Sequence, residues 1–349
     1  MANVLPNLVD WARRADPDGV IADIAEMLAQ SNECLKDMIW QEGNLPLGHK
    51  VTLRVALPQG TWRGNNQGVA STKSMTSQVQ FGIGMLSAYS MVDCALAELG
   101  GEVAKFRYSE DMSFIEGLSQ QVASALFYSN EAVNPGQFTG FAPNYWSIST
   151  SNTKAAANTM NCGGSGSSNS SMWLIGWGDN TTFGIFPKGS QAGLVYKDLG
   201  DIVPAFDSNN NQFQAYRSYF EWKLGLAIKN WQYNVRLANI DTTTTAGGVF
   251  STTPPDLFVY MAQAVVKLPT ASRRGSGITQ VDAPDDPSPG ISPAFYMNRT
   301  IRAVLDVQAI RDKNVLLDFR DYAGEPTLMF RDFPLRVVDA LTTSEATLT

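Results

Sequence analysis

Two stretches of alternating apolar and polar residues lie on either side of a long polar segment. The apolar residues are Val51, Leu53, Val55 and Leu57 in the first stretch, and Val79, Phe81, Ile83 and Met85 in the second. Alternation with period two gives a β-strand one apolar face, so the pattern predicts a hairpin with a long tip over Pro58–Thr76. A two-stranded hairpin is marginally stable by itself, and helical patterns rather than further strands flank this one. We therefore expect its apolar face to rest on a neighbouring copy of the chain.

The remaining sequence mixes helical and extended patterns. Helical spacing predicts an N-terminal arm of helices before Gly43 and a long helix from Ser109, as its N-cap, to Asn130. Further helices are predicted at Pro254–Val266 and Ala294–Ile310, and exposed loops at Thr150–Ser171 and Arg273–Pro293. Strands are predicted within Met172–Phe186, as a pair within Tyr216–Ile240, and at Val315–Phe319, Thr327–Phe330 and Pro334–Val338. No βαβ rhythm is present, so the expected class is α+β.

Composition narrows the range of functions. Charged residues make up 17% of the 349 residues, and 26 basic against 33 acidic residues give a net charge of −7. No run of five or more basic residues is present, so tight sequence-independent binding of DNA is not expected. Neither a signal peptide nor a membrane-spanning segment is visible, which predicts a soluble protein that needs no membrane. The three cysteines, Cys34, Cys94 and Cys162, are widely spaced and indicate a reducing compartment rather than a disulfide framework or a metal site.

Few residues have the pattern of a catalytic or cofactor site. The only histidine, His49, is placed at the root of the hairpin, where it is either an ordinary polar residue or a hinge that titrates near neutral pH. The Gly163–Gly166 run lacks the lysine of a phosphate loop and is interpreted as an exposed loop. An enzyme hypothesis remains in Asp179 and Glu221, which lie near tryptophans in the sequence and could form a sugar cleft with paired acids. We expect no catalytic residue, cofactor or metal.

The hairpin tip is the better candidate for a functional surface. Trp62, Arg63 and Asn66 lie in a loop long enough to reach a neighbour, and Trp and Arg are enriched at interface hot spots. Arg54 and Arg63 are expected to pair with acids of an adjoining subunit. Phe81, on the apolar face, is expected to be required for assembly but not for folding. These residues, with Lys73 near the tip, are the predicted inter-subunit contacts.

The order of elements resembles the HK97-like major capsid proteins of tailed bacteriophages. Within that family, the segments Glu42–Lys50, Leu57–Pro58, Trp62–Arg63, Asn66–Val69 and Trp231–Asp241 are similar to capsid proteins of the epsilon15/BPP-1 type of short-tailed phages. The resemblance implies an N-terminal arm at 1–46, an E-loop hairpin at 47–90, a peripheral domain with a spine helix at 91–140, and an axial domain at 141–349. Strands at 216–240 are expected to return to the peripheral domain. The resemblance leaves open whether the connectivity after residue 140 is permuted.

The same resemblance implies a non-enzymatic shell protein. Its copies would form hexamers and pentamers that close into an icosahedral virion shell around double-stranded DNA, contacted weakly and without sequence specificity. Separate scaffold, portal and decoration proteins are the expected partners, and the host cytoplasm is the expected site of assembly. In one relative a lysine of the E-loop forms a cross-link, a role for which Lys73 is the candidate here. A nanocompartment shell, a decoration protein or adhesin, and the sugar-acting enzyme are the alternatives.

Overall fold

The computed structural model describes Pro6 and residues 30–148, 155–200, 202–206, 209–244, 247–251, 254–269, 291–311, 317–322 and 325–349. The helices predicted before residue 30 lie outside these residues, as does nearly all of the predicted loop at 273–293. Between residues 30 and 43 the helical prediction holds only for Cys34–Asp37, whereas Trp40–Glu42 forms a strand because it pairs with residues 184–186. In chain order the elements are α2 (Cys34–Asp37), β1 (Trp40–Glu42), β2 (Gly48–Ala56), β3 (Met75–Gly82), β4 (Gly84–Asp93), α3 (Cys94–Ala97), η1 (Glu98–Gly100), α4 (Val103–Tyr128), α5 (Phe141–Asn144), η2 (Ala155–Asn158), β5 (Thr159–Asn161), β6 (Asn169–Trp177), β7 (Thr182–Phe186), β8 (Leu194–Asp198), β9 (Val203–Phe206), β10 (Gln212–Ile228), η3 (Trp231–Tyr233), β11 (Asn234–Asp241), α6 (Leu257–Lys267), β12 (Ser292–Met297), α7 (Arg299–Arg311), β13 (Leu317–Tyr322), β14 (Glu325–Phe330) and β15 (Phe333–Val337).

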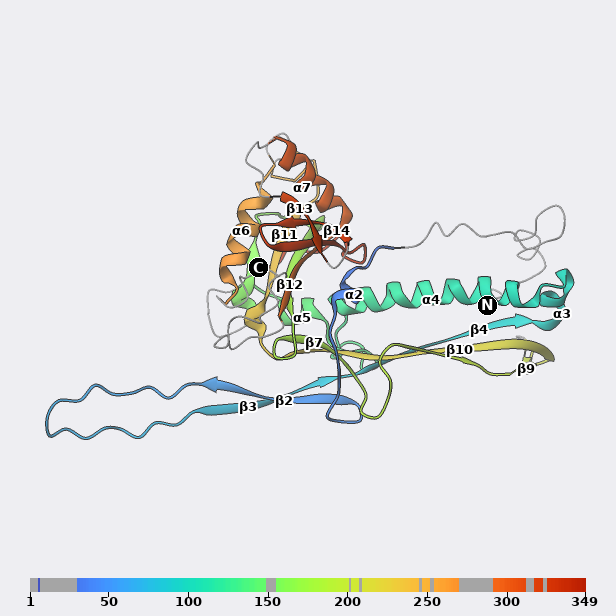
Figure 1. Cartoon of the computed structure of the whole chain (residues 1–349), viewed down its shortest axis with the longest axis horizontal. Helices are drawn as coiled ribbons and strands as arrows, with labels where there is room; N and C mark the ends of the chain where they lie inside the picture. Colours follow the sequence, from blue (N-terminus) through green and yellow to red (C-terminus); the bar gives the residue numbers. More distant parts are fainter. Residues whose placement is uncertain are drawn as a thin grey trace.

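The molecule is elongated and has three parts (Figure 1). A compact body contains α6, α7 and the C-terminus. An arm formed by α4, β4 and β10 extends from the body on one side. On the other side extends a hairpin of β2 and β3, which we call the ribbon (residues 48–82).

The arm is a helix lying on an antiparallel sheet. β10 pairs with β4 along ten residues and with β8 and β9 on its other edge. The helix α4 covers one face of this sheet, where Phe114 stacks on Phe220 at 6.1 Å and Ser218 donates a hydrogen bond to Asp111. The opposite face of the sheet carries the odd-numbered residues of β4.

The long helix begins earlier than the sequence pattern predicts. It starts at Val103, and the hydroxyl of Ser109, the predicted N-cap, donates to the Phe106 carbonyl inside the helix. Phe106 is fully buried in a cluster with Val92 and Leu96. Because this contact stabilises the first two turns, burial of an aromatic side chain outweighs the local capping signal.

In the body, β6 separates two hydrophobic cores. All nine of its residues are buried, and β11 and β12 pair with its two edges. Met172 and Leu174 point into a core covered by α6 and α7. Trp173, Ile175 and Trp177 point into a second core with the C-terminal part of α4 and with α5. Successive side chains of a strand alternate between the two faces, so one central strand supplies both cores.

Three sequence predictions are corrected in the body. Residues 294–297, predicted as the start of a helix, belong to β12, and helix α7 begins only at Arg299. The two strands predicted within Tyr216–Ile240 are present as β10 and β11, but they pair with other strands and not with each other. Asn169–Ser171, assigned to an exposed loop, is the fully buried start of β6.

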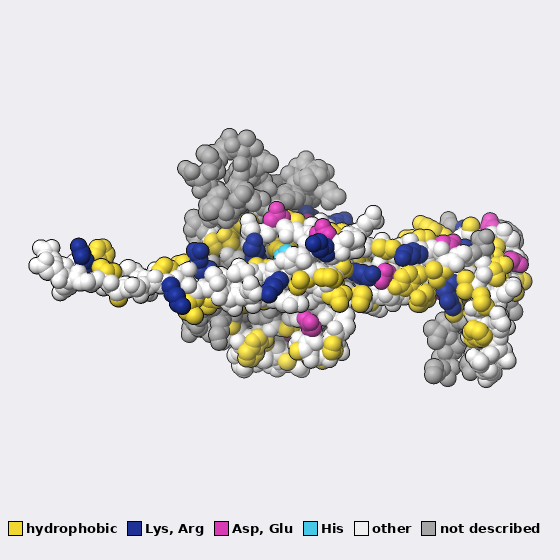
Figure 2. Space-filling view, turned by 90° about the horizontal axis from the view of Figure 1, so that it is seen from below, with side chains coloured by type: hydrophobic (Ala, Val, Ile, Leu, Met, Phe, Trp, Pro, Cys, Tyr) yellow, Lys and Arg dark blue, Asp and Glu magenta, His cyan; other side chains and the backbone are white. Residues whose placement is uncertain are grey.

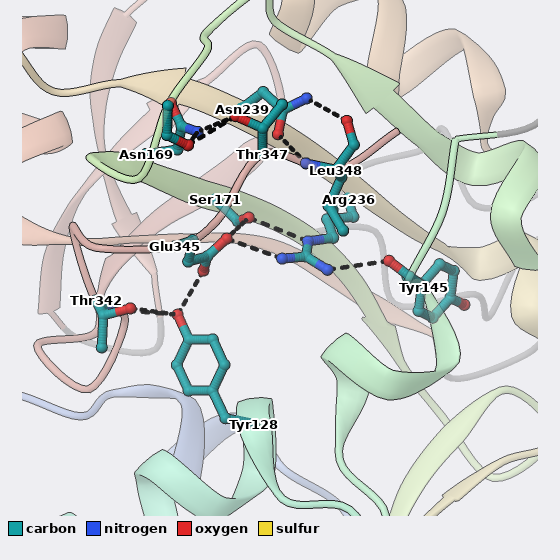
Figure 3. A network of polar contacts seen from close by, with 11 residues as sticks. Tyr128, Tyr145, Asn169, Ser171, Arg236, Asn239, Thr342, Glu345, Thr347 and Leu348 are labelled. Carbon is teal, nitrogen blue, oxygen red and sulfur yellow. Dashed lines mark hydrogen bonds and ion pairs between the residues drawn. The ribbon is translucent and has the colours of Figure 1, made fainter.

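A buried polar network joins the body, the end of α4 and the C-terminal segment (Figure 3). The Arg236 guanidinium donates to the Glu345 carboxylate at 2.8 Å, to the Ser171 hydroxyl at 3.0 Å and to the Tyr145 carbonyl at 3.0 Å. Tyr128, on the last turn of α4, donates its hydroxyl to Glu345. Burial raises the pKa of Tyr128, and the Glu345 charge raises it further, so the hydroxyl keeps its proton. The network thus connects the sheet of the body, the end of α4 and the C-terminal segment, which are far apart in the sequence.

Candidate assembly interface

The ribbon is a regular antiparallel hairpin in its first half. Its register runs from Gly48 opposite Gly82 to Arg54 opposite Thr76, and then shifts so that Ala56 lies opposite Met75. Beyond this point residues 57–74 contain no helix or strand. A local turn closes the tip, where the Gln67 amide donates to the Gly64 carbonyl at 3.4 Å and Asn66 has a φ of 64°.

The root of the ribbon rests on its own subunit. His49 makes an edge-to-face contact with Phe183 of β7 at 5.4 Å, and Phe81 packs against Phe183 and Ile185. Val51 is 6% exposed. The expectation that the apolar face rests wholly on a neighbouring copy is therefore wrong for the root, which lies on the body's own sheet.

His49 is held in a partly apolar site at this root. Burial lowers its pKa below the ordinary histidine value, and the charge of Lys229 lowers it further. Both causes favour the neutral imidazole, whose Nδ1 is buried with no hydrogen-bond partner among the described residues. This environment agrees more closely with the structural interpretation of His49 than with a group poised to titrate at neutral pH.

The distal half of the ribbon contacts nothing else in the described chain that would bury it. Val55 is 68% exposed, Leu57 is 71% exposed and Trp62 is completely exposed. Arg54, Arg63, Asn66 and Lys73 are exposed as well. Isolated exposed apolar residues are common on protein surfaces, but several of them on one projecting hairpin favour an interaction surface.

The six predicted contact residues lie in different parts of the ribbon. Arg63 and Asn66 lie in the same tip turn, where Arg63 donates to the Gln67 carbonyl at 3.3 Å, and Trp62 directly precedes them. Arg54 lies farther back, opposite Thr76. Phe81 lies apart from the others, at the root, and packs on its own subunit, so its proposed role between subunits stays a prediction.

A second exposed apolar surface was not identified from the sequence. It is the face of the arm's sheet that α4 does not cover (Figure 2). Tyr89 packs on Tyr219 at 4.8 Å, and the Arg217 guanidinium lies 5.6 Å from the Tyr89 ring centre. Met85 and Tyr89 are each 56% exposed. The alternation of Met85, Tyr89 and Met91 was available as a signal, but which face a helix covers is decided only by the tertiary packing.

The enzyme hypothesis finds no geometric support. Thr182 pairs with Ile228, and Asp179 lies just before Thr182 in the chain. Glu221 lies seven residues before Ile228 on the same strand, which places it about 23 Å farther along β10. Trp173 and Trp177 are fully buried and cannot serve as sugar platforms. Glu221 instead pairs with Lys223 at 3.0 Å.

The other candidates for chemistry have structural explanations. The Gly163–Gly166 run is a loop held by backbone hydrogen bonds. Gly164 donates to the Asn239 carbonyl, and Gly166 accepts from the Thr347 amide. All three cysteines are buried and unpaired, and burial raises the pKa of Cys162 to about 12. Within the described ranges, no group of three His, Cys, Asp or Glu residues is placed to hold a metal ion. Of the described helices, none combines the length and apolar character needed to span a lipid bilayer.

One cavity of about 400 Å³ lies between the C-terminal half of α4 and the start of β4. Small and apolar residues such as Gly84, Ala125 and Phe138 line it, and Tyr128 is its only titratable residue. It offers no pair of groups for acid–base or nucleophilic chemistry.

Comparison with known proteins agrees with a structural role. The chain matches the family model described as "Major capsid protein GP7" over residues 16–349. It is similar to a solved chain of bacteriophage Epsilon15, with 32% identity, a TM-score of 0.75, and coverage of 100% of this chain and 99% of that chain. The bacteriophage JBD30 capsid matches at 10% identity and a TM-score of 0.46, covering 97% of this chain and 96% of that chain. No curated protein sequence matches the chain.

Proposed function

Because this chain belongs to the GP7 family of major capsid proteins and is a structural subunit of a phage capsid, we propose that its ribbon fastens neighbouring copies into the shell. The observation that carries the proposal is the distal half of the ribbon, whose apolar side chains are exposed in the isolated subunit. Burying these side chains against a second copy would supply the stabilisation that a single hairpin lacks.

The exposed face of the arm's sheet is the receiving surface in this proposal. It presents Met85, Tyr89 and Tyr219, and the ribbon presents Val55, Leu57 and Trp62. Two exposed apolar surfaces on one chain, at different ends of an elongated molecule, can cover each other when copies are arranged in a ring. Repetition of this contact would link each subunit to the next.

The larger assembly is a second part of the proposal and is supported by membership of the capsid protein family. The copies form hexamers and pentamers that close into an icosahedral shell around double-stranded DNA, and assembly takes place in the host cytoplasm with separate scaffold, portal and decoration proteins. The N-terminal arm corresponds to residues 1–46, the E-loop to 47–90 and the peripheral domain to 91–140 with the returning strand β10. The axial domain comprises the rest of residues 141–349. β11, expected among the returning strands at 216–240, pairs with β5 and β6 of the body and is assigned to the axial domain in this proposal.

The test compares two valine substitutions at similarly exposed positions. Val55→Asp places a charge on the distal ribbon, where Val55 is 68% exposed, and Val133→Asp does so beyond the end of α4, where Val133 is 71% exposed. We expect both subunits to fold, and only Val55→Asp to fail to form closed particles in negative-stain electron microscopy. Normal particles from Val55→Asp would exclude the ribbon as the fastening element. Protection of DNA from nuclease inside wild-type particles would support the proposal that the shell encloses the genome, and its absence would contradict it.

A further inference from the structure

The charges of the ribbon differ in sign from those of the rest of the chain. Residues 48–82 contain Lys50, Arg54, Arg63 and Lys73 and no Asp or Glu. The remainder therefore carries 22 basic against 33 acidic residues. In Figure 2 the Lys and Arg side chains are spaced along the ribbon, not gathered at one end. The ribbon is thus a cationic element on an acidic protein.

The arginines of the ribbon also differ from the other arginines in their contacts. The other arginines with described side chains contact an acidic side chain, an aromatic ring or a thioether of their own subunit: Arg107, Arg217, Arg236, Arg299, Arg302, Arg331 and Arg336. Arg63 makes a hydrogen bond only to a carbonyl of its own turn. Neither Arg54 nor Arg63 lies within ion-pair distance of a carboxylate in the described parts of the chain. The ribbon's guanidinium groups are therefore available to a partner.

The register places two of the four cations on one face of the paired part of the ribbon. Lys50 and Arg54 lie opposite Gln80 and Thr76, so their side chains share a face. The alternate face, with His49, Val51 and Phe81, is the one that packs on β7 at the root. The cationic face therefore points away from the subunit's own body, where a second molecule can reach it.

Resting on the function proposed above, we infer that the cationic side chains of the ribbon pair electrostatically with acidic side chains of the second copy, beside the apolar contact. A second copy supplies the required charge, since the chain outside the ribbon has eleven more acidic than basic residues. The ribbon also exposes Val55, Leu57 and Trp62, and exposed apolar side chains favour a protein surface over a nucleic acid backbone as the partner. Opposite charges of this kind accelerate association and fix which surfaces meet.

The experiment measures assembly of purified, nuclease-treated subunits by light scattering at NaCl concentrations from about 50 mM to about 1 M. Arg54→Gln with Arg63→Gln removes two charges from the ribbon. Arg54→Lys with Arg63→Lys keeps the charges, and Lys36→Gln with Lys188→Gln removes two charges from exposed lysines of the body. A fourth variant lacks the tip residues 62–68.

We expect the Arg→Gln pair to assemble roughly tenfold or more slowly at low salt, because steering by opposite charges raises association rates by about this factor or more. The difference should disappear near 1 M NaCl, where the screening length is about 3 Å. The assembly rates of the Arg→Lys double variant and of the body lysine double variant should stay within about twofold of the wild-type rate, which is small compared with the expected effect of electrostatic steering.

An Arg→Gln pair that assembles at the wild-type rate with the wild-type salt dependence would overturn the inference. If the tip deletion blocks assembly in the same experiment, the proposed function stands without the electrostatic docking. A tip deletion that assembles normally would overturn the proposed function itself. If the Arg→Gln pair forms DNA-free shells normally but retains less DNA, the charges serve the nucleic acid, and docking on a second copy is excluded.

Discussion

Arg236 and Glu345 form an ion pair at 2.8 Å although their side chains are only 5% and 7% exposed. Arg236 lies on β11, and Glu345 lies four residues from the end of the chain. The guanidinium also lies 5.1 Å from the Trp173 ring centre, and Ser171, Tyr145 and Tyr128 supply the remaining hydrogen bonds of the pair. A buried pair that is fully hydrogen-bonded is tolerated in a core, whereas either charge alone is not.

Removing one partner of this pair should therefore be costly. Glu345→Gln preserves shape but leaves the Arg236 charge buried, so the free energy of unfolding in urea should fall by about 3–5 kcal/mol. Arg299→Gln, which breaks an ion pair whose arginine is 69% exposed, is the matched control and should cost at most about 1 kcal/mol. Equal losses in the two variants would show that the buried network contributes no more than a surface pair.

The single histidine makes the stability of the folded chain depend on pH, and the direction of this dependence can be predicted. Burial and the charge of Lys229 lower the pKa of His49 in the folded state below its ordinary value of 6.5. At pH values well above 6.5 the residue is neutral in both folded and unfolded chains. As the pH falls below this value the unfolded chain binds a proton first, so stability declines until the folded pKa is passed and then levels off.

An NMR titration of the only histidine resonance should give a midpoint below 6.5. The corresponding loss of stability on acidification should be smaller in His49→Gln than in the wild type, since glutamine does not titrate. A midpoint at or above the ordinary value would contradict the buried environment assigned to the ribbon root.

Substitutions at Phe81 and Val55 should differ in their effect on the stability of the unassembled subunit. Phe81 packs on Phe183 and Ile185 of its own subunit, so Phe81→Asp should lower the free energy of unfolding by about 2 kcal/mol or more. Val55→Asp changes an exposed position and should leave that energy within about 0.5 kcal/mol of wild type. Thermal unfolding of the unassembled subunits measures both. A Phe81→Asp subunit as stable as wild type would restore the expectation that this residue serves assembly alone.

Two glycines should respond in opposite directions to alanine. A Cβ at Gly225 would lie 2.5 Å from the Gly82 carbonyl oxygen, at the point where the ribbon joins the body. Gly225→Ala should therefore destabilise the subunit, by about 1–3 kcal/mol. Gly117, in the middle of α4, has open space around its Cβ position, and Gly117→Ala should stabilise the helix by about 0.5–1 kcal/mol. The same sign for both substitutions in urea unfolding would contradict these packing assignments.

The buried thiols should be unreactive in the native subunit. Cys34, Cys94 and Cys162 are unpaired and buried, and burial raises the pKa of each thiol. Because the thiolate is the reactive species, a thiol reagent at about pH 8 should label none of them quickly in the folded chain and all three in denaturant. Rapid labelling of a folded subunit would identify a cysteine that the structure places incorrectly in the core.

Elements with a strong periodicity could be predicted from the amino-acid sequence. The alternation around Val51 and Val79 predicted the hairpin, and these two residues lie directly opposite each other in the structure. The α+β class, the later helix at 257–267 and the three C-terminal strands also followed from local pattern. Period and propensity act over a few residues, so they can be read without knowing what lies nearby. The match of residue order to capsid proteins likewise needed only the sequence.

Which surfaces of these elements are covered depends on contacts between distant parts of the chain. Alternation showed that Phe81 and Tyr89 lie in strands, but not that Phe81 packs on its own β7 while Tyr89 remains exposed. Residues 292–297 form a strand because β6 and β15 offer them free edges. Asn169 and Ser171 are buried because the C-terminal segment returns to hydrogen-bond with them. Contacts between residues far apart in the chain depend on the packing of the whole molecule, which no local pattern records.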